Sequence, residues 1–240
     1  MCYSLSVFSD INALIRRFGA RIAEGVAFSR RYYVSGFAFP PVPVIANHDP
    51  DRIQSFRWGL VPAWVRDLRK ADQIRLRTLN ARYESLRQRP SFKDAFRDRR
   101  CLVLVDGFFE FREVRGGKYP YFIHMRSGEL FALAGLWDAW RNPATGGEEK
   151  TFTIVTVPAN PLLARIHNTK KRMPLILSRE AEREWLARPF GKDEVREVTE
   201  GFDETVLEAY PVTRRIASRD VDGSDGSLLD RRDVPEWKGD

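Results

Sequence analysis

The chain has 240 residues, of which 43% are hydrophobic and 12% aromatic, and its formal net charge is +7. This composition supplies the core of a compact domain and excludes a chain that is disordered throughout. Its longest apolar runs are far shorter than the roughly 20 residues of a membrane-spanning helix, and no basic and then apolar leader opens the chain, so we expect a soluble, cytoplasmic protein with no membrane partner.

The apolar and β-branched runs predict more strands than helices. In chain order, strands are expected at Cys2 to Phe8, Tyr32 to Ala38, Ile53 to Trp58, Cys101 to Val105, Phe108 to Arg112, Tyr121 to Met125, Phe131 to Trp137, Phe152 to Val157 and Leu175 to Leu177. Helices are expected after Asp10, over Ala81 to Arg89, over Phe92 to Arg97, and over Arg179 to Ala187 behind the N-cap candidate Ser178.

The order of these elements indicates a single α+β domain. Strands and helices do not alternate regularly, and we find no internal repeat and no glycine-rich phosphate loop. We expect a curved, largely antiparallel, barrel-like β-sheet flanked by short helices over residues 1–217. A run of Asp, Gly and Ser between Asp220 and Ser227 predicts that the C-terminal tail, residues 218–240, is partly mobile.

The two cysteines, Cys2 and Cys101, are too few for a disulfide framework and form no C-x-x-C pair, so no metal site is expected. Aminopeptidases remove an initiator methionine when the next side chain is small, which would make Cys2 the N-terminus. Its α-amine, with a pKa of about 7.7 to 8.0, and its thiol, at about 8.5, then form a 1,2-aminothiol.

A 1,2-aminothiol has a reaction that an internal cysteine lacks. An aldehyde forms a Schiff base with the amine, and the thiol then closes on the imine carbon to give a thiazolidine ring. The alternative is that Cys2 is an ordinary small apolar residue at the start of an edge strand.

Three polar residues in apolar surroundings are further candidates. Asn80 is a candidate functional residue, and the alternative is that it caps a helix. Glu110 shares a strand face with Phe108, opposite Phe109 and Phe111, and a carboxylate among aromatic rings has a raised pKa unless it is paired with an arginine. His167 titrates near neutrality and can act as acid or base, although a lone histidine is more often structural.

The basic residues are concentrated in one stretch. Arg52 to Arg115 holds 16 Lys and Arg against 8 Asp and Glu, whereas Ile176 to Asp240 holds 11 against 17. Of the 40 basic residues 32 are arginine, whose planar guanidinium suits phosphate oxygens and stacks on bases. The aromatic residues among them, Trp58 and Trp64 included, fit a groove for single-stranded nucleic acid. An arginine-rich solvated surface and ordinary core packing explain the same pattern.

Several short motifs occur in one consistent order. They are Met1-Cys2, Arg57 to Trp64, Asn80 to Glu84, Arg99 to Leu102, Asp106 to Phe111, Ala134 to Asp138 and Ile166 to Leu177. Together they resemble the SRAP family, the SOS response-associated peptidases, over roughly Met1 to Thr213. Members of this family use the N-terminal cysteine to crosslink themselves to abasic sites in single-stranded DNA, where the opened sugar presents an aldehyde at C1′.

The resemblance implies a catalytic role for four residues. Cys2 would be the nucleophile through both its amine and its sulfur, and Asn80 would hold and orient it. Glu110 would support iminium formation and proton transfer, and His167 would assist opening of the sugar ring. No cofactor is implied.

The resemblance also implies DNA contacts. Arg82 and Arg172 match arginines that contact the DNA backbone beside the lesion, and we expect Trp58 and Trp64 to bind DNA as well. The chain departs from the family at two places. It reads Cys2-Tyr3-Ser4 where Cys-Gly-Arg is usual, which removes an arginine near phosphate, and two extra residues separate His167 from Arg172.

From the resemblance we expect a monomer whose partner is single-stranded DNA containing abasic sites, associated with the nucleoid if the source is bacterial. The family name implies a peptidase (hydrolase) activity that removes Met1. We also expect a lyase activity in DNA repair. Two other readings stay open. An N-terminal-nucleophile amidohydrolase would release ammonia from glutamine, and a non-catalytic nucleic-acid binding module would bind DNA regardless of an abasic site.

Overall fold

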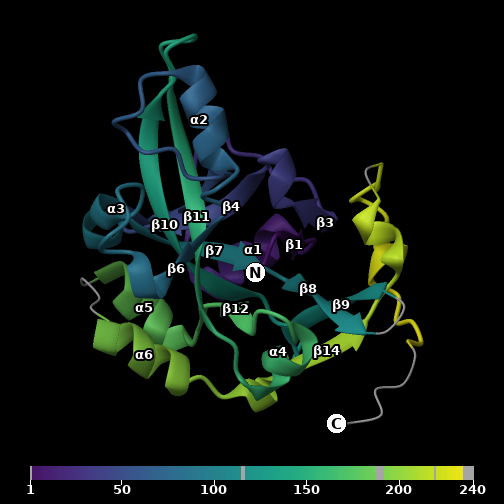
Figure 1. The fold of residues 1–240 in the computed structure, drawn as a ribbon. Helices are drawn as coiled ribbons and strands as arrows, with labels where there is room; N and C mark the ends of the chain where they lie inside the picture. Colours follow the sequence, from purple (N-terminus) through teal and green to yellow (C-terminus); the bar gives the residue numbers. More distant parts are fainter. Residues whose placement is uncertain (1, 115–116, 188–191, 219, 235–240) are drawn as a thin grey trace.

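A closed five-stranded barrel is the centre of the computed structural model, which describes residues 2–114, 117–187, 192–218 and 220–234 (Figure 1). Neighbouring strands pair antiparallel around the barrel, and β11 then pairs parallel with β5 to close it. In barrel order the strands are β5 (Asp49–Trp58), β4 (Pro41–Ala46), β7 (Arg100–Val105), β10 (Phe131–Arg141) and β11 (Glu148–Pro158).

A second, antiparallel sheet of five strands lies beside the barrel. Its order is β14 (Leu207–Pro211), β9 (Gly117–Met125), β8 (Gly107–Val114), β1 (Ser4–Val7) and β3 (Arg31–Ser35). The chain passes from β7 of the barrel into β8 of this sheet through Asp106 alone. The first strand of the chain, β1, therefore lies between β8 and β3, next to the strand that follows the barrel.

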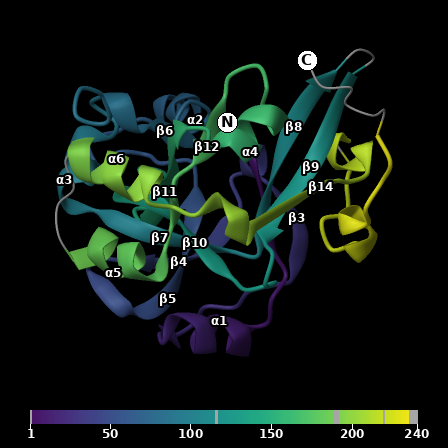
Figure 2. The same cartoon turned by 90° about the horizontal axis from the view of Figure 1, so that it is seen from below.

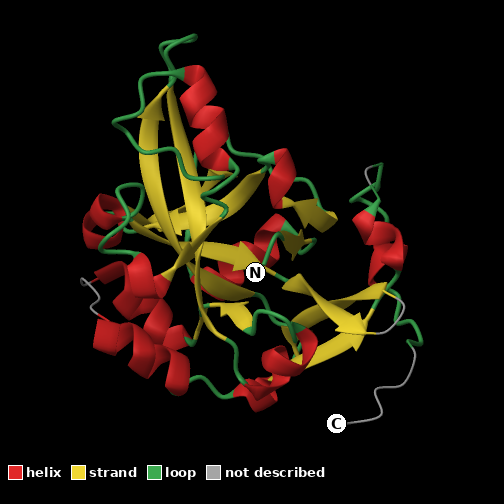
Figure 3. Ribbon diagram, in the orientation of Figure 1, coloured by secondary structure: helices red, strands yellow, loops and turns green. Residues whose placement is uncertain are grey.

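Short helices and turns surround the two sheets (Figures 2 and 3). The helices are α1 (Ile11–Phe18), α2 (Leu68–Arg75), α3 (Lys93–Asp98), α4 (Pro161–Ile166), α5 (Arg179–Ala187) and α6 (Lys192–Glu200). The 3-10 turns are η1 (Gly36–Ala38), η2 (Tyr83–Ser85), η3 (Glu204–Val206), η4 (Arg214–Ala217) and η5 (Gly226–Leu229). The remaining short strands are β2 (Arg21–Ile22), β6 (Asn80–Arg82), β12 (Arg172–Pro174) and β13 (Ile176–Leu177). Within the described ranges, no helix is long and apolar enough to cross a membrane.

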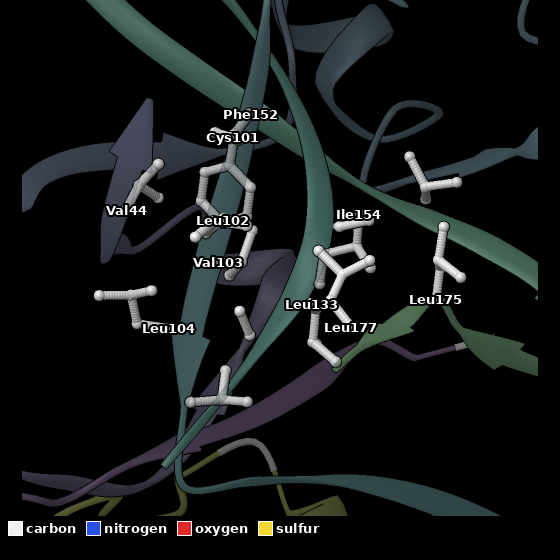
Figure 4. Packing of buried hydrophobic residues seen from close by; sticks show 14 of the residues in the cluster. Val44, Cys101, Leu102, Val103, Leu104, Leu133, Phe152, Ile154, Leu175 and Leu177 are labelled. Carbon is white, nitrogen blue, oxygen red and sulfur yellow. The ribbon is translucent and has the colours of Figure 1, made fainter. Parts of the chain in front are cut away.

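Among the described residues the core has two main parts, which lie on opposite faces of the second sheet, and a small third cluster around Val65 and Trp140. The larger part fills the barrel with aliphatic and aromatic side chains such as Val103, Leu133 and Ile154 (Figure 4), and it includes Phe108. Phe109 belongs to the smaller part instead. The predicted alternation along this strand is therefore confirmed, and it directs Glu110 to the same side as Phe108.

The sequence-based fold class is confirmed as a single α+β domain with a barrel-like, largely antiparallel sheet. Helices α1, α3 and α5 form where they were predicted. The helix predicted over Ala81 to Arg89 is wrong. Residues 80–82 are strand β6, which pairs parallel with β11, and only a 3-10 turn follows.

The C-terminal segment contributes to the smaller part of the core. Leu228 of η5 is fully buried there, together with Val212 and Ile216. Residue 219 and residues 235–240 lie outside the described residues. The boundary at residue 217 and the mobility of the tail stay predictions.

Candidate active site

Cys2 is held at the start of β1 by the pairing of this strand on both sides. Ser4 lies opposite Phe109 of β8 and opposite Ser35 of β3. The Cys2 side chain is fully buried, and its Sγ donates a weak hydrogen bond to the Ser4 carbonyl oxygen at 3.5 Å. Burial raises the pKa of this thiol above its ordinary value. The sulfur is therefore a protonated thiol at neutral pH and needs a proton acceptor when it reacts.

Asn80 connects the barrel to the N-terminal segment. It lies on β6, opposite Ile154 of β11, and its Nδ2 donates a hydrogen bond of 2.8 Å to the Cys2 carbonyl oxygen. Because Asn80 is in a strand, the alternative that it caps a helix is wrong. The carboxamide instead fixes the position of the residue that becomes the N-terminus.

Trp58 supports Asn80 from inside the core. Its Nε1 donates to the Leu79 carbonyl oxygen at 2.8 Å, and its ring is fully buried. A DNA base cannot stack on a ring without exposed surface. The DNA contact predicted for Trp58 is therefore corrected to a structural role behind β6.

Glu110 is buried on β8, with 2% of its surface exposed. Continuing the β1–β8 register by one residue beyond Ser4 and Phe109 places it opposite Tyr3. Burial raises its pKa from 4.5 to about 7, and its charge in turn adds to the raised pKa of the Cys2 thiol. Glu110 and Cys2 are thus electrostatically coupled, and at neutral pH the carboxyl can both give and take a proton.

His167 follows helix α4 and is anchored near the same strand. Helix α4 packs on β8, and the Asn168 side chain accepts from the Glu113 N–H at 3.0 Å and donates to the Glu113 carbonyl oxygen at 2.7 Å. His167 Nδ1 lies 2.9 Å from the Arg172 carbonyl oxygen, and burial lowers the pKa of the ring. The Arg172 backbone nitrogen also lies 3.2 Å from Nδ1. Because the carbonyl oxygen is the closer of the two, we assign the neutral tautomer that donates to it through Nδ1, with the lone pair on Nε2.

Arg82 and Trp64 are both exposed at the surface, and their DNA contacts stay predictions. Arg82 ends strand β6, two residues after Asn80, is exposed, and takes part in no ion pair within the described ranges. Trp64 is 44% exposed, with Lys70 Nζ 5.2 Å from its ring centroid.

Arg172 is buried rather than exposed. Its guanidinium pairs with the Glu84 carboxylate and donates to the Thr156 carbonyl oxygen at 2.5 Å. With both terminal nitrogens bonded to Glu84 or Thr156 and 5% of its surface exposed, it does not present a phosphate-binding group. The DNA contact predicted for Arg172 is therefore corrected to a structural one that links β12 to η2. Glu84, the partner of Arg172, was not among the predicted site residues, although it lies inside the Asn80 to Glu84 motif.

The raised pKa of Glu110 predicts that stability depends on pH. The folded protein holds this proton more tightly than the unfolded chain, so the stability that it contributes is complete below about pH 4.5 and is lost as the pH rises through about 7. Glu110→Gln has a neutral side chain at every pH. The unfolding free energy of this variant relative to that of the wild type should therefore rise by about 3 kcal/mol from pH 5 to pH 8. Urea denaturation at both pH values measures this.

The control for this prediction is Glu113→Gln on the same strand. Its side chain is 41% exposed and pairs with Lys118 at the surface. We expect the difference between this variant and the wild type to change little with pH. A Glu110→Gln difference that stays constant from pH 5 to pH 8 would contradict the buried, protonated carboxyl.

The fold and the site define a class of protein: an α+β barrel protein whose second residue is a buried cysteine, held by an asparagine and coupled to a buried glutamate. Within the described part of the chain, no group of three or more His, Cys, Asp or Glu could hold a metal ion.

A family model, SOS response associated peptidase (SRAP), matches residues 1–219, and the chain belongs to this family. It is 32% identical over 225 residues to the abasic site processing protein YoqW of Bacillus subtilis, covering 91% of this chain and 95% of YoqW. It is 34% identical to the abasic site processing protein HMCES of Gallus gallus over 154 residues, which cover 56% of this chain and 45% of HMCES. Among solved structures, a Bacteroides thetaiotaomicron protein matches with a TM-score of 0.87 and 33% identity, covering 96% of this chain and all of that one.

Proposed function

We propose that this protein binds single-stranded DNA and forms a covalent thiazolidine crosslink between Cys2 and abasic sites, which shields these sites during the DNA damage response. The observation that carries the proposal is the 2.8 Å hydrogen bond from Asn80 to the Cys2 carbonyl, with the buried Glu110 coupled to the Cys2 thiol. Relatives named abasic site processing proteins support it.

The reaction begins with removal of Met1, by an aminopeptidase or by the protein itself, which converts the Cys2 nitrogen from an amide to an amine. The abasic sugar must then open. The neutral His167 accepts the proton of the C1′ hydroxyl on Nε2, the C1′–O4′ bond breaks, and His167 returns this proton to O4′, which leaves the ring neutral again. The product of this step is the C1′ aldehyde.

The crosslink then forms in two steps with Glu110 moving protons. The Cys2 amine adds to the aldehyde carbon to give a carbinolamine. Protonated Glu110 gives its proton to the hydroxyl of this intermediate, the hydroxyl leaves as water, and an iminium remains. The sulfur adds to the iminium carbon, and the thiol proton returns to the Glu110 carboxylate. The net change is one aldehyde and one aminothiol converted to one thiazolidine and one water.

The direct test is the intact mass of the protein after incubation with single-stranded DNA that carries one abasic site. We expect the mass of the protein without Met1 plus that of the DNA, less one water. An unchanged protein mass would contradict the crosslink. Release of ammonia from glutamine would instead support an amidohydrolase, and equal affinity for abasic and undamaged DNA without an adduct would support a simple binding module.

Arg82 allows binding to be tested apart from chemistry. Arg82→Ala should weaken affinity for undamaged and abasic strands alike, because a phosphate contact does not depend on the base. The slope of log affinity against log salt concentration should fall by about one unit. Fluorescence anisotropy at several salt concentrations measures both quantities.

The control for Arg82→Ala is Arg16→Ala. It removes one exposed positive charge from α1, which Figure 2 draws at the bottom of the view, whereas β6 lies at the top. An equal loss of salt slope in both variants would show a general effect of net charge and no contact at Arg82.

A further inference from the structure

Tyr3 and Phe37 form an aromatic pair directly beside Cys2. Their ring centroids are 5.0 Å apart and their planes differ by 30°, which is a stacked arrangement. Tyr3 is half-buried and packs on the edge of the larger core, whereas Phe37 is 56% exposed. Most phenylalanines lie in the core because burial of the ring is favourable in free energy, and a ring as exposed as that of Phe37 lacks most of this stabilisation.

Backbone contacts hold this pair against the candidate site. The Gly36 N–H donates to the Tyr3 carbonyl oxygen at 2.8 Å. The first residue of η1 is therefore bonded to the residue that follows Cys2. Gly36 also lies against Trp58, where a Cβ would come within 3.1 Å of the indole ring. The same buried tryptophan that supports Asn80 through Leu79 therefore supports the turn that carries Phe37.

Two arginines lie on segments next to η1 and next to Asn80. Arg57 donates to the carbonyl oxygen of Phe39, just after η1, and its side chain pairs with Glu149 at 3.5 Å while staying 43% exposed. Arg82 is exposed at the end of the strand that carries Asn80. Exposed aromatic rings beside arginines, at a site that accepts a strand of phosphates, are the combination that binds unpaired bases.

The residue types at positions 3 and 4 also point to a base. Tyr3 and Ser4 follow Cys2 directly in this chain. Ser4 is buried, and its hydroxyl donates to the Tyr33 hydroxyl oxygen at 3.1 Å, so it offers nothing to a phosphate. The chain thus lacks a charged group at this place and has an aromatic one beside it.

We propose that the Tyr3–Phe37 pair is a stacking platform for the unpaired nucleobase that flanks the abasic sugar. This rests on the proposed function, since it places the lesion at Cys2. A base next to an abasic site has lost its stacking neighbour on one side, so its exposed face can be covered by a ring without first separating two bases.

The test uses binding without chemistry. Two single-stranded oligonucleotides carry a central tetrahydrofuran, an abasic analogue with no aldehyde. One keeps both flanking bases, and the other has tetrahydrofuran at the flanking positions as well. By fluorescence anisotropy the wild type should prefer the first on the order of 10-fold, the effect of one stacked base. Oligonucleotides that lack a single flanking base identify the side that stacks.

Variants of the pair decide whether it carries this preference. Phe37→Ala and Tyr3→Gly should abolish it, while Phe37→Trp should keep it. Ile11→Ala, which truncates another exposed apolar side chain, on helix α1, should leave it unchanged. Melting curves confirm that each variant is folded.

Two outcomes would overturn the platform. In the first, Phe37→Ala weakens the binding of both oligonucleotides equally. In the second, it leaves the preference for the oligonucleotide with flanking bases intact. Failure of the proposed function is a separate result, seen as the absence of an adduct with a true abasic strand in the intact mass of the wild type. The anisotropy measurement does not depend on that adduct.

Discussion

Cys2→Ala should form no heat-stable adduct with abasic single-stranded DNA. Its α-amine can still condense with the aldehyde, but a Schiff base hydrolyses, and alanine has no sulfur to close the ring. We therefore expect complete loss of the stable species on a denaturing gel and in the intact mass, with at most a labile Schiff base. A stable adduct of unchanged yield in Cys2→Ala would sink the thiazolidine mechanism.

Two further variants test the same mechanism. An added residue that is retained before Cys2 should also abolish the adduct, because the nitrogen is then an amide. Cys101→Ala is the matched control for the thiol. Cys101 is as buried as Cys2, lies inside the barrel on β7, and has an amide nitrogen in the mature protein. It should lose some stability by creating a small cavity but keep the full adduct yield.

His167→Ala should form the adduct on the order of 10- to 1000-fold more slowly and reach a similar final yield. Its neutral ring opens the sugar by proton transfer in the proposed mechanism, whereas the aminothiol and the DNA-binding residues do not depend on it. The loss is limited because the aldehyde form exists in equilibrium without help from the protein. A time course of adduct formation measures the rate constant and the yield separately.

The control is His124→Ala. His124 on β9 makes the same kind of contact, with its Nδ1 2.8 Å from the Met125 carbonyl oxygen, but it was not assigned to the site. We expect a normal rate in this variant. If His167→Ala instead melts at a lower temperature and its surviving fraction reacts at the normal rate, the catalytic assignment is wrong and the histidine is structural.

The sequence by itself determined the features that depend on local patterns. The place of Cys2 next to the initiator methionine indicates the aminothiol without any knowledge of the fold. The period of two along Phe108 to Phe111 separates Glu110 from Phe109, since successive side chains of a strand point to opposite faces. The N-cap candidate Ser178 marked α5, whose Ala181 N–H bonds the serine hydroxyl at 3.2 Å.

Only the tertiary structure decided which residues are covered and which strands meet. Asn80 is in a strand and not a helix because it pairs with β11, a contact across more than 70 residues of sequence that outweighs local propensity. Strand β4 escaped prediction because Pro41 and Pro43 argue against a strand, yet it pairs on both sides inside the barrel.

The same reason explains the two corrected DNA contacts and the unforeseen aromatic pair. Trp58 and Arg172 carry the chemistry of DNA-binding residues, but burial is set by long-range packing, and both are enclosed by segments distant in sequence. Phe37 lay inside a predicted strand with no sign of exposure. Its position beside Tyr3 follows from the pairing of β1 with β3, which no local pattern encodes.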